Sequence, residues 1–337
     1  MKVLITGVAG FVGFHVASKL ISKNFKVVGI DNLNNYYEVS LKKSRLKNIL
    51  NNSNSKNFKF YLKDIRDQKA IKNIFFKEKP EVVIHLAAQA GVRYSLINPR
   101  LYMETNIMGF FNIIEESKKN NIKHFLYASS SSVYGANKKI PFSETDQASH
   151  PLQLYAATKR SDELIAHTYS YLYNLPTTGL RFFTVYGPWG RPDMSVFIFT
   201  KKILNREIIK ISDGEIYRDY TYISDICECI FSLINKAPKK TSYAYKDFLP
   251  NNSSIAPYSI FNIGNNKPVK LTKLIKIIEE ELKIKSKKKF FKKNSMDMNY
   301  TYADIDEIKS KFKFSNRTTI EEGIKNFVNW FKDYYKI

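Results

Sequence analysis

The chain has 337 residues, of which 44% are hydrophobic and 14% aromatic, a composition typical of a globular protein and not of a disordered one. No apolar stretch is long enough to span a membrane, so we expect no membrane partner. The only two cysteines, Cys227 and Cys229, are too few for a disulfide framework or a zinc site, so we expect no metal and a reducing cytoplasmic location. The formal net charge is +23, but basic residues are spread along the chain, with the densest run at 283–293, which indicates a solvated surface and not nucleic-acid binding.

The first 183 residues alternate between short apolar runs and stretches with helical spacing. Such alternation predicts an α/β fold with a Rossmann-type, doubly wound parallel sheet. The expected buried strands are residues 3–5, 27–30, 58–62, 82–85, 124–128 and 178–183, and the expected helices are residues 12–22, 68–76, 102–119 and 154–173.

The pattern is less regular after about residue 185. There we expect a loop punctuated by proline and glycine. The elements expected after it are a helix at residues 196–205, strands at 208–211 and 216–222, a polar exposed loop at 236–257, and helices at 273–282 and 319–334. The predicted division is a cofactor domain over residues 1–180 and a smaller α/β substrate lobe over residues 181–337, with segments free to interleave.

A glycine motif stands between the first expected strand and the first expected helix. It reads G-x-x-G-x-x-G, with glycines at Gly7, Gly10 and Gly13. Glycines let the backbone turn tightly and approach a dinucleotide pyrophosphate, whose charge sits at the helix N-terminus. The motif therefore predicts a nicotinamide cofactor.

An acid at the end of the second strand selects the form of that cofactor. The carboxylate of Asp31 accepts hydrogen bonds from a ribose diol and repels a 2′-phosphate, so NAD is favoured over NADP. The other residues that we expect around the cofactor are Phe11, Val12, Asn32, Asp64, Ile65, Leu86, Ala87, Ala88 and Asn106.

Three polar residues form the candidate chemical site. Tyr155 and Lys159 are four residues apart, so they share one face of a helix, and Ser130 stands where the fifth strand ends. A free tyrosine has a pKa of about 10, too high for a base at neutral pH, and a nearby ammonium stabilises the phenolate. We expect Tyr155 to act as the base, Ser130 to bridge it to a substrate hydroxyl, and Lys159 to support the phenolate and bind the nicotinamide ribose.

Three longer segments, at residues 31–37, 85–95 and 181–194, carry a specific resemblance. With them the chain resembles the extended short-chain dehydrogenase/reductases over nearly its whole length, and among these the nucleotide-sugar 4-epimerases, above all the UDP-glucuronate 4-epimerases. The resemblance implies that Ser130, Tyr155 and Lys159 are catalytic. It also implies interconversion of UDP-glucuronic and UDP-galacturonic acid through a 4-keto intermediate, with tightly bound, recycled NAD, and a homodimer formed by the helices at 102–119 and 154–173.

The same resemblance assigns the substrate site to Thr184, Arg191, Arg218 and Asn262. UDP-glucose epimerases usually have asparagine where Thr184 stands, and a shorter hydroxyl leaves room for a C6 carboxylate and can donate to it. Ser131 and Ser132 add donors, Arg93 is a candidate counter-charge, and the forked guanidinium groups of Arg191 and Arg218 suit a diphosphate.

One segment departs from the family. Its usual Gln-Pro-Gly-Asp-Val-Pro stretch, which closes over the nucleotide, is replaced by residues 294–299, where only the acid Asp297 is kept. We expect this change to bear on UDP affinity more than on the chemistry.

Several alternatives stay open. UDP-glucuronate decarboxylases and nucleotide-sugar 4,6-dehydratases typically carry an acid where Ser132 stands. A 4-epimerase of UDP-glucose or of a UDP-N-acetylhexosamine would share the mechanism. A non-catalytic NAD sensor on the same fold would tend to lose Tyr155 or Lys159, and both are present.

Overall fold

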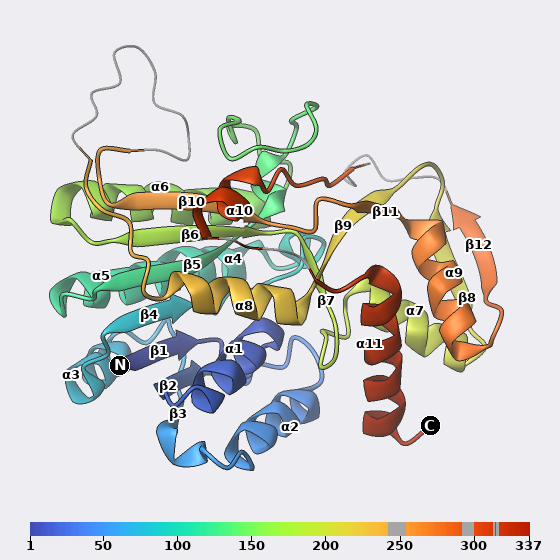
Figure 1. Cartoon of the computed structure of the whole chain (residues 1–337), viewed down its shortest axis with the longest axis horizontal. Helices are drawn as coiled ribbons and strands as arrows, with labels where there is room; N and C mark the ends of the chain where they lie inside the picture. Colours follow the sequence, from blue (N-terminus) through green and yellow to red (C-terminus); the bar gives the residue numbers. More distant parts are fainter. Residues whose placement is uncertain (242–253, 292–299, 313, 315–316) are drawn as a thin grey trace.

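Seven parallel strands form the main sheet, in the order β10-β6-β5-β4-β1-β2-β3 (Figure 1). The computed structural model describes residues 1–241, 254–291, 300–312, 314 and 317–337. All six strands expected in the first part of the chain are present and the Rossmann-type sheet is confirmed, with β10 as a seventh strand. The strands are β1 (Lys2–Thr6), β2 (Lys26–Asp31), β3 (Phe58–Leu62), β4 (Val82–His85), β5 (His124–Ser130), β6 (Thr177–Phe182) and β10 (Tyr258–Ile263).

Helices cover both faces of this sheet. One face carries α1 (Phe11–Ser22), α2 (Val39–Leu50), α8 (Ile223–Leu233) and α10 (Asp306–Phe312), and the other carries α3 (Gln68–Glu78), α5 (Phe110–Lys119) and α6 (Leu154–Tyr173). Side chains alternate across a strand, so Val3 and Ile5 join the core under α1 and α8 while Leu4 joins the core under α3 and α5.

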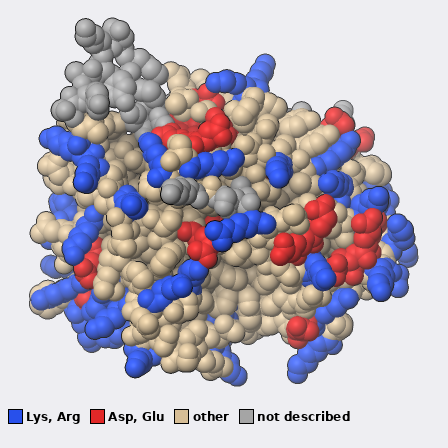
Figure 2. Space-filling view, viewed as in Figure 1, with Lys and Arg blue, Asp and Glu red and all other residues tan. Residues whose placement is uncertain are grey.

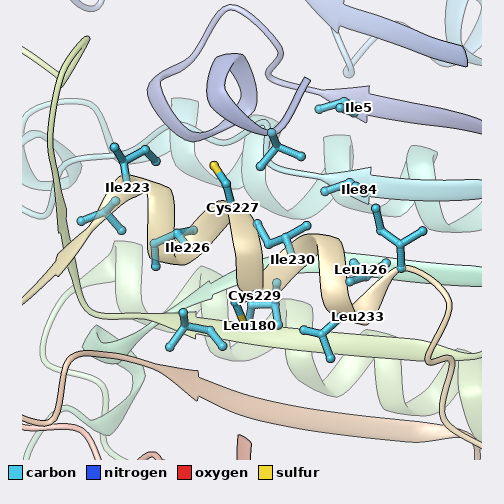
Figure 3. Packing of buried hydrophobic residues seen from close by; sticks show 14 of the residues in the cluster. Ile5, Ile84, Leu126, Leu180, Ile223, Ile226, Cys227, Cys229, Ile230 and Leu233 are labelled. Carbon is cyan, nitrogen blue, oxygen red and sulfur yellow. The ribbon is translucent and has the colours of Figure 1, made fainter. Parts of the chain in front are cut away.

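The helix α8 shows how tightly this layer packs. Its residues Ile226, Ile230 and Leu233 lie against Ile84 and Leu126 of the sheet (Figure 3). The two cysteines belong to the same helix and are buried free thiols. They fill apolar space, as short apolar side chains do.

The second lobe has its own core. A three-stranded sheet and a two-stranded sheet pack with three helices around Phe197, Ile278 and Phe331. These elements are β7 (Thr184–Tyr186), β9 (Tyr217–Tyr222), β11 (Pro268–Lys270), β8 (Ile208–Ser212), β12 (Lys287–Phe291), α7 (Ser195–Leu204), α9 (Leu271–Leu282) and α11 (Ile320–Tyr335). The division at residue 180 stays a prediction; α8 and β10 follow that point in the chain and pack with the first sheet.

The prediction of one regular helix over residues 102–119 is wrong. The chain forms α4 (Pro99–Tyr102), then a π-helical segment, η3 (Met103–Gly109), and then α5. The wider turn turns Asn106 inward, where its side chain accepts a hydrogen bond from the backbone N–H of Gln89 at 2.8 Å. A π-turn inside a helix is a frequent mark of a functional site.

Three short 3-10 turns, η1 (Ser55–Asn57), η2 (Tyr94–Leu96) and η4 (Ser131–Tyr134), complete the described elements. The expected loop at 236–257 lies largely outside the described residues, which break off between 241 and 254.

Basic side chains are scattered over the face of the molecule in Figure 2, with acidic side chains between them. Within the described ranges, no helix has both the length and the apolar character needed to cross a bilayer. Nor do three His, Cys, Asp or Glu side chains of this part of the chain come together in a way that could hold a metal ion.

Candidate active site

A cleft of about 800 Å³ opens at the carboxyl ends of the parallel strands, where ligands bind in open α/β sheets. Residues of the second lobe, including Thr184 and Arg218, form its opposite wall. Twenty of the residues expected from the sequence line this one cleft: Gly7, Gly10, Phe11, Val12, Gly13, Asp31, Asn32, Ile65, Leu86, Ala87, Ala88, Arg93, Ser130, Ser131, Ser132, Tyr155, Lys159, Thr184, Arg191 and Arg218.

The glycine motif forms a cradle with no room for side chains. A Cβ atom on Gly13 would lie 2.1 Å from the carbonyl oxygen of Gly7, and one on Gly7 would lie 2.8 Å from the backbone nitrogen of Ala87. Gly7 also has a φ of +72°, which L side chains rarely adopt. The cradle leads into the N-terminus of α1, so its shape and its dipole fit a pyrophosphate.

Asp31 stands beside this cradle at the end of β2. Its carboxylate accepts hydrogen bonds from the backbone N–H groups of Ala9, at 3.0 Å, and Leu33, at 2.9 Å. Burial raises the pKa of Asp31, while these hydrogen bonds and the Lys42 ammonium oppose the rise. A carboxylate held in this way can accept hydrogen bonds from a ribose diol.

Two expected cofactor residues, Asp64 and Asn106, are not among those that line the cleft. Asp64 accepts a hydrogen bond from the side-chain amide of Asn32 at 2.8 Å. Asn106 donates to the carbonyl oxygen of Gln89 at 3.1 Å and to the Thr158 hydroxyl at 3.0 Å, and so joins the loop after β4 to α6. The structure therefore gives Asp64 and Asn106 supporting positions, and does not bring them into the cleft.

The three candidate catalytic groups face the cleft from neighbouring elements. Tyr155 is in the first turn of α6, Lys159 follows one turn later, and Ser130 ends β5. The Ser130 hydroxyl donates to the Ser132 hydroxyl at 3.1 Å. Lys159 is 2% exposed, and its ammonium donates to the Asp162 carboxylate at 3.0 Å. The ammonium is thus held in one place before any ligand is considered.

A buried ion pair fixes the end of β5 against α6. Glu163 accepts two hydrogen bonds from the guanidinium of Arg181, at 2.8 and 2.9 Å, and one from the Ser129 hydroxyl at 2.6 Å. Burial, the largest influence, would raise the pKa of Glu163, but the guanidinium groups of Arg181 and Arg160 and the Ser129 hydroxyl together hold that pKa below its ordinary value. Since Ser129 precedes Ser130, the ion pair sets the position of Ser130 relative to Tyr155.

The expected substrate residues line the cleft from both lobes, with Ser131, Ser132 and Arg93 on the first and Thr184, Arg191 and Arg218 on the second. Ser131, Ser132 and Thr184 supply hydroxyl groups, and the guanidinium groups of Arg93, Arg191 and Arg218 reach the same cleft. Arg191 forms a bidentate pair with Asp193, with nitrogen–oxygen distances of 2.9 and 2.6 Å. Arg218 donates to the carbonyl oxygen of Tyr217 at 2.9 Å.

Asn262 is not among the residues that line the cleft. It is fully buried, and its side-chain amide donates to the carbonyl oxygens of Phe142, at 2.8 Å, and Asp304, at 3.0 Å, while its oxygen accepts from the Tyr134 hydroxyl at 2.6 Å. The structure does not bring Asn262 to the substrate wall. Asp297 lies outside the described residues.

Several polar residues around the cleft are not among those expected from the sequence, Tyr36, Lys42, Arg45 and Asp193 among them. Tyr36, Lys42 and Asp193 line it, and Arg45 lies directly behind. Tyr36 and Asp193 belong to the distinctive segments at 31–37 and 181–194, which was a signal that they matter. Lys42 and Arg45 lie on α2, a largely polar helix that gave no pattern to follow.

The chain matches a protein-family model described as GDP-mannose 4,6 dehydratase over residues 4–327. It belongs to this family. Among curated members, the Staphylococcus aureus protein CapI is 51% identical and the Rhizobium meliloti "probable UDP-glucuronate 4-epimerase" is 43% identical. The first alignment covers 100% of both chains, and the second covers 100% of this chain and 98% of the relative.

Solved structures in the family have the same architecture. The UDP-glucuronic acid 4-epimerase of Bacillus cereus, in complex with UDP-glucuronic acid and NAD, superposes with a TM-score of 0.87 at 30% identity, over 99% of this chain and 100% of that one. The UDP-glucose 4-epimerase of Thermotoga maritima, with UDP-glucose, gives a TM-score of 0.84 at 30% identity, with the same coverage. The overall fold is therefore common to epimerases with different sugars.

Glu144, next to Asn262, makes stability depend on pH. Its carboxylate accepts a hydrogen bond from the backbone N–H of Asn262 at 2.7 Å, and burial raises its pKa from 4.5 to about 7. Between these values the folded protein keeps a proton that the unfolded chain releases, so stability falls as the pH rises through this range.

The variant Glu144→Gln keeps the acceptor but cannot ionise. We expect its free energy of unfolding to fall less between pH 5 and pH 8 than that of the wild type, by roughly 1–3 kcal/mol. Urea unfolding at both pH values measures this difference, with Asp333→Asn as a surface control that should behave as the wild type. An unchanged pH dependence in Glu144→Gln would contradict the assignment.

Proposed function

We propose that the protein is an NAD-dependent 4-epimerase that interconverts UDP-glucuronic acid and UDP-galacturonic acid. The observation that carries the proposal is the convergence of Ser130, Tyr155 and Lys159 with the glycine cradle in one cleft. The hydroxyl groups of Ser131, Ser132 and Thr184, here called the hydroxyl wall, and three guanidinium groups line the same cleft. Full-length relatives with the name UDP-glucuronate 4-epimerase support this choice of reaction.

The residues of the cradle fit NAD. Gly7, Gly10 and Gly13 would hold its pyrophosphate, and Asp31 would hold a ribose diol. When bound, NAD supplies an acceptor for hydride from C4 of the sugar and later a donor of the same hydride. No net oxidation results, so the cofactor has no need to leave.

The protein's own residues move the proton. The Tyr155 phenolate, with Ser130 beside it, takes the proton from the sugar O4 and later returns it. Lys159 follows Tyr155 by one turn on the same face of α6, and its buried ammonium is held there by the Asp162 carboxylate. The diphosphate tether stays bound while the 4-keto sugar turns its other face to the site.

The hydroxyl wall suits a sugar acid. With a C4 carbonyl and a C6 carboxylate both attached to C5, the 4-keto intermediate is a β-keto acid, which loses CO₂ readily. Donors from Ser131, Ser132 and Thr184 would hold the carboxylate so that the C5–C6 bond stays out of line with the carbonyl. The same donors distinguish a carboxylate from a hydroxymethyl group, because charge-assisted hydrogen bonds are stronger than neutral ones.

Other reactions predict other products. A 4-epimerase of UDP-glucose or of a UDP-N-acetylhexosamine would use the same Tyr155 chemistry on a neutral sugar. A UDP-glucuronate decarboxylase would release a UDP-pentose, but Ser132 stands where such enzymes typically carry an acid.

We propose further that the protein is a cytoplasmic homodimer. The free cysteines Cys227 and Cys229 are compatible with a reducing compartment. The helices α5 and α6 pack side by side and leave Phe111, Leu164 and Leu172 exposed by 37, 54 and 58%. A second copy would cover these side chains in a four-helix bundle.

The first test is turnover without added cofactor. UDP-glucuronic acid incubated with the purified protein should yield UDP-galacturonic acid, and proton NMR should show the same mixture from either side. Tyr155→Phe should lower the rate by about 10²- to 10⁴-fold while it leaves the bound NAD in place. A UDP-pentose with CO₂ would indicate a decarboxylase, and conversion of UDP-glucose alone would overturn the choice of sugar.

The hydroxyl wall is tested by Thr184→Val, which keeps the shape of the side chain and removes the donor. We expect the KM for UDP-glucuronic acid to rise by about 10-fold, as for a lost hydrogen bond to a charged group, and more CO₂ to be released per turnover. Thr272→Val on the exposed side of α9 is the matched control. An equal KM in both variants would remove Thr184 from carboxylate recognition.

The dimer is tested by Leu164→Glu, which places a charge on the exposed apolar face of α6. Sedimentation velocity should show a dimer for the wild type and a monomer for the variant. Leu50→Glu is the control, because Leu50 is 54% exposed on α2, which covers the other face of the sheet from α5 and α6. A wild type that sediments as a monomer would exclude this assembly.

A further inference from the structure

The loop at 187–194 is attached to the cofactor lobe at three points. This loop connects β7 to α7 and carries Arg191. A ring nitrogen of His15, on α1, donates to the carbonyl oxygen of Pro188 at 2.9 Å. The His15 side chain is neutral, because burial lowers its pKa to about 4. The Tyr36 hydroxyl donates to the Asp193 carboxylate at 3.0 Å. The third attachment is Arg45 of α2.

Arg45 joins the loop directly to the glycine cradle. One nitrogen of its guanidinium donates to the carbonyl oxygen of Ala9, between Gly7 and Gly10, at 2.9 Å and to the Tyr37 hydroxyl at 2.6 Å. The other nitrogen donates to the carbonyl oxygen of Trp189 at 2.6 Å and, more weakly, to the carbonyl oxygen of Gly190 at 3.4 Å. One side chain thus spans the two loops that are proposed to hold the two diphosphates.

The environment of Arg45 is unusual for a charged group. The residue is 0% exposed, and it forms no ion pair with any residue of the described ranges. A buried charge is costly unless it is paired or fully hydrogen-bonded. The Asp31 carboxylate interacts with this charge through space, and the phosphates proposed on both sides would add to that attraction.

The conformation of the loop depends on these contacts. Trp189 has a φ of +63°, a left-handed conformation that costs free energy in a bulky residue. Its carbonyl oxygen is held by Arg45, and its ring packs against Phe14 and Trp330, with centroid distances of 5.4 Å to each. Arg191 follows two residues later, so its position is set by this arrangement.

We propose that Arg45 is a positioning residue that fixes the loop of Arg191, and with it the diphosphate of the sugar nucleotide, to the glycine cradle of the cofactor. Hydride transfer needs the reacting atoms about 3–3.5 Å apart, so the two diphosphates must be bound at a constant separation. The identity of the ligand as a nucleoside diphosphate sugar rests on the proposed function. That Arg45 joins the two loops does not depend on the proposed function, because it follows from the hydrogen bonds of Arg45.

The test uses two variants of Arg45 in the full-length protein with its retained cofactor. Arg45→Met removes all the donors and keeps much of the stem, and Arg45→Lys keeps the charge but cannot reach both loops. Lys47→Met, on the exposed side of the same helix, is the control that loses the same charge. The readouts are the Kd for UDP by calorimetry, the NAD retained per protomer, and KM and kcat for UDP-glucuronic acid.

We expect Arg45→Met to bind UDP about 10- to 100-fold more weakly and to retain less NAD, and Arg45→Lys to fall between it and the wild type. Lys47→Met should match the wild type. If Arg45→Met does not fold, Arg45→Lys decides the question. A folded Arg45 variant with lower thermal stability but unchanged Kd for UDP and unchanged NAD content would overturn the proposal, since a purely structural role gives that result. Failure of the wild type to bind UDP would instead overturn the proposed function, and this inference with it.

Discussion

Backbone crowding at the carboxyl edge of the sheet determines where the groups of the cleft stand. The turn after β1 brings Gly7 and Gly13 so close that a single Cβ atom would collide with a carbonyl oxygen. It also brings Gly7 close to the backbone of Ala87 after β4. The cradle and the loop after β4 therefore form one rigid surface. That loop is tied through Asn106 to Thr158 of α6, the helix that carries Tyr155 and Lys159. The proposed pyrophosphate site and the position of the candidate base Tyr155 are in this way consequences of the same steric constraint.

Polar contacts, more than apolar ones, fix the catalytic helix against the sheet. Thr158, Lys159, Asp162 and Glu163 are all buried on α6. An apolar stripe would hold a helix against a sheet but would tolerate small rotations, whereas the hydrogen bonds of Glu163 to Arg181 and Ser129 allow one rotation only. Removing one partner of such a pair typically costs about 3–5 kcal/mol, because the other charge stays buried. The buried polar residues of α6 thus stabilise the fold and also fix the orientation of the helix that carries Tyr155 and Lys159.

The sequence predicted the main sheet well because its parallel strands are buried on both faces and appear as continuous apolar runs. It also placed the candidate catalytic residues in elements that line the cleft, since Tyr155 and Lys159 share a helix face that any α-helix would create. It did not reveal α2, whose apolar residues are few, or the π-turn around Asn106, which depends on a distant backbone partner. The same limit applies to Asn262 and Arg45. Whether a polar side chain lines a cleft or lies behind it depends on tertiary contacts, and sequence spacing carries no information about those.

The seventh strand has a consequence for synthesis of the protein. β10 completes the edge of the sheet beside β6, and α8 covers strands β4 and β5 on one face, yet both follow β6 in the chain by 40 residues or more. A nascent chain that has just left the ribosome with β6 therefore has an unpaired strand edge and an uncovered apolar face. Such surfaces are prone to aggregation until they are paired. The sheet of the cofactor lobe is complete only when the residues up to Ile263 have emerged, and α10, which packs on β10, follows later still, so translation of the second lobe is part of folding the first.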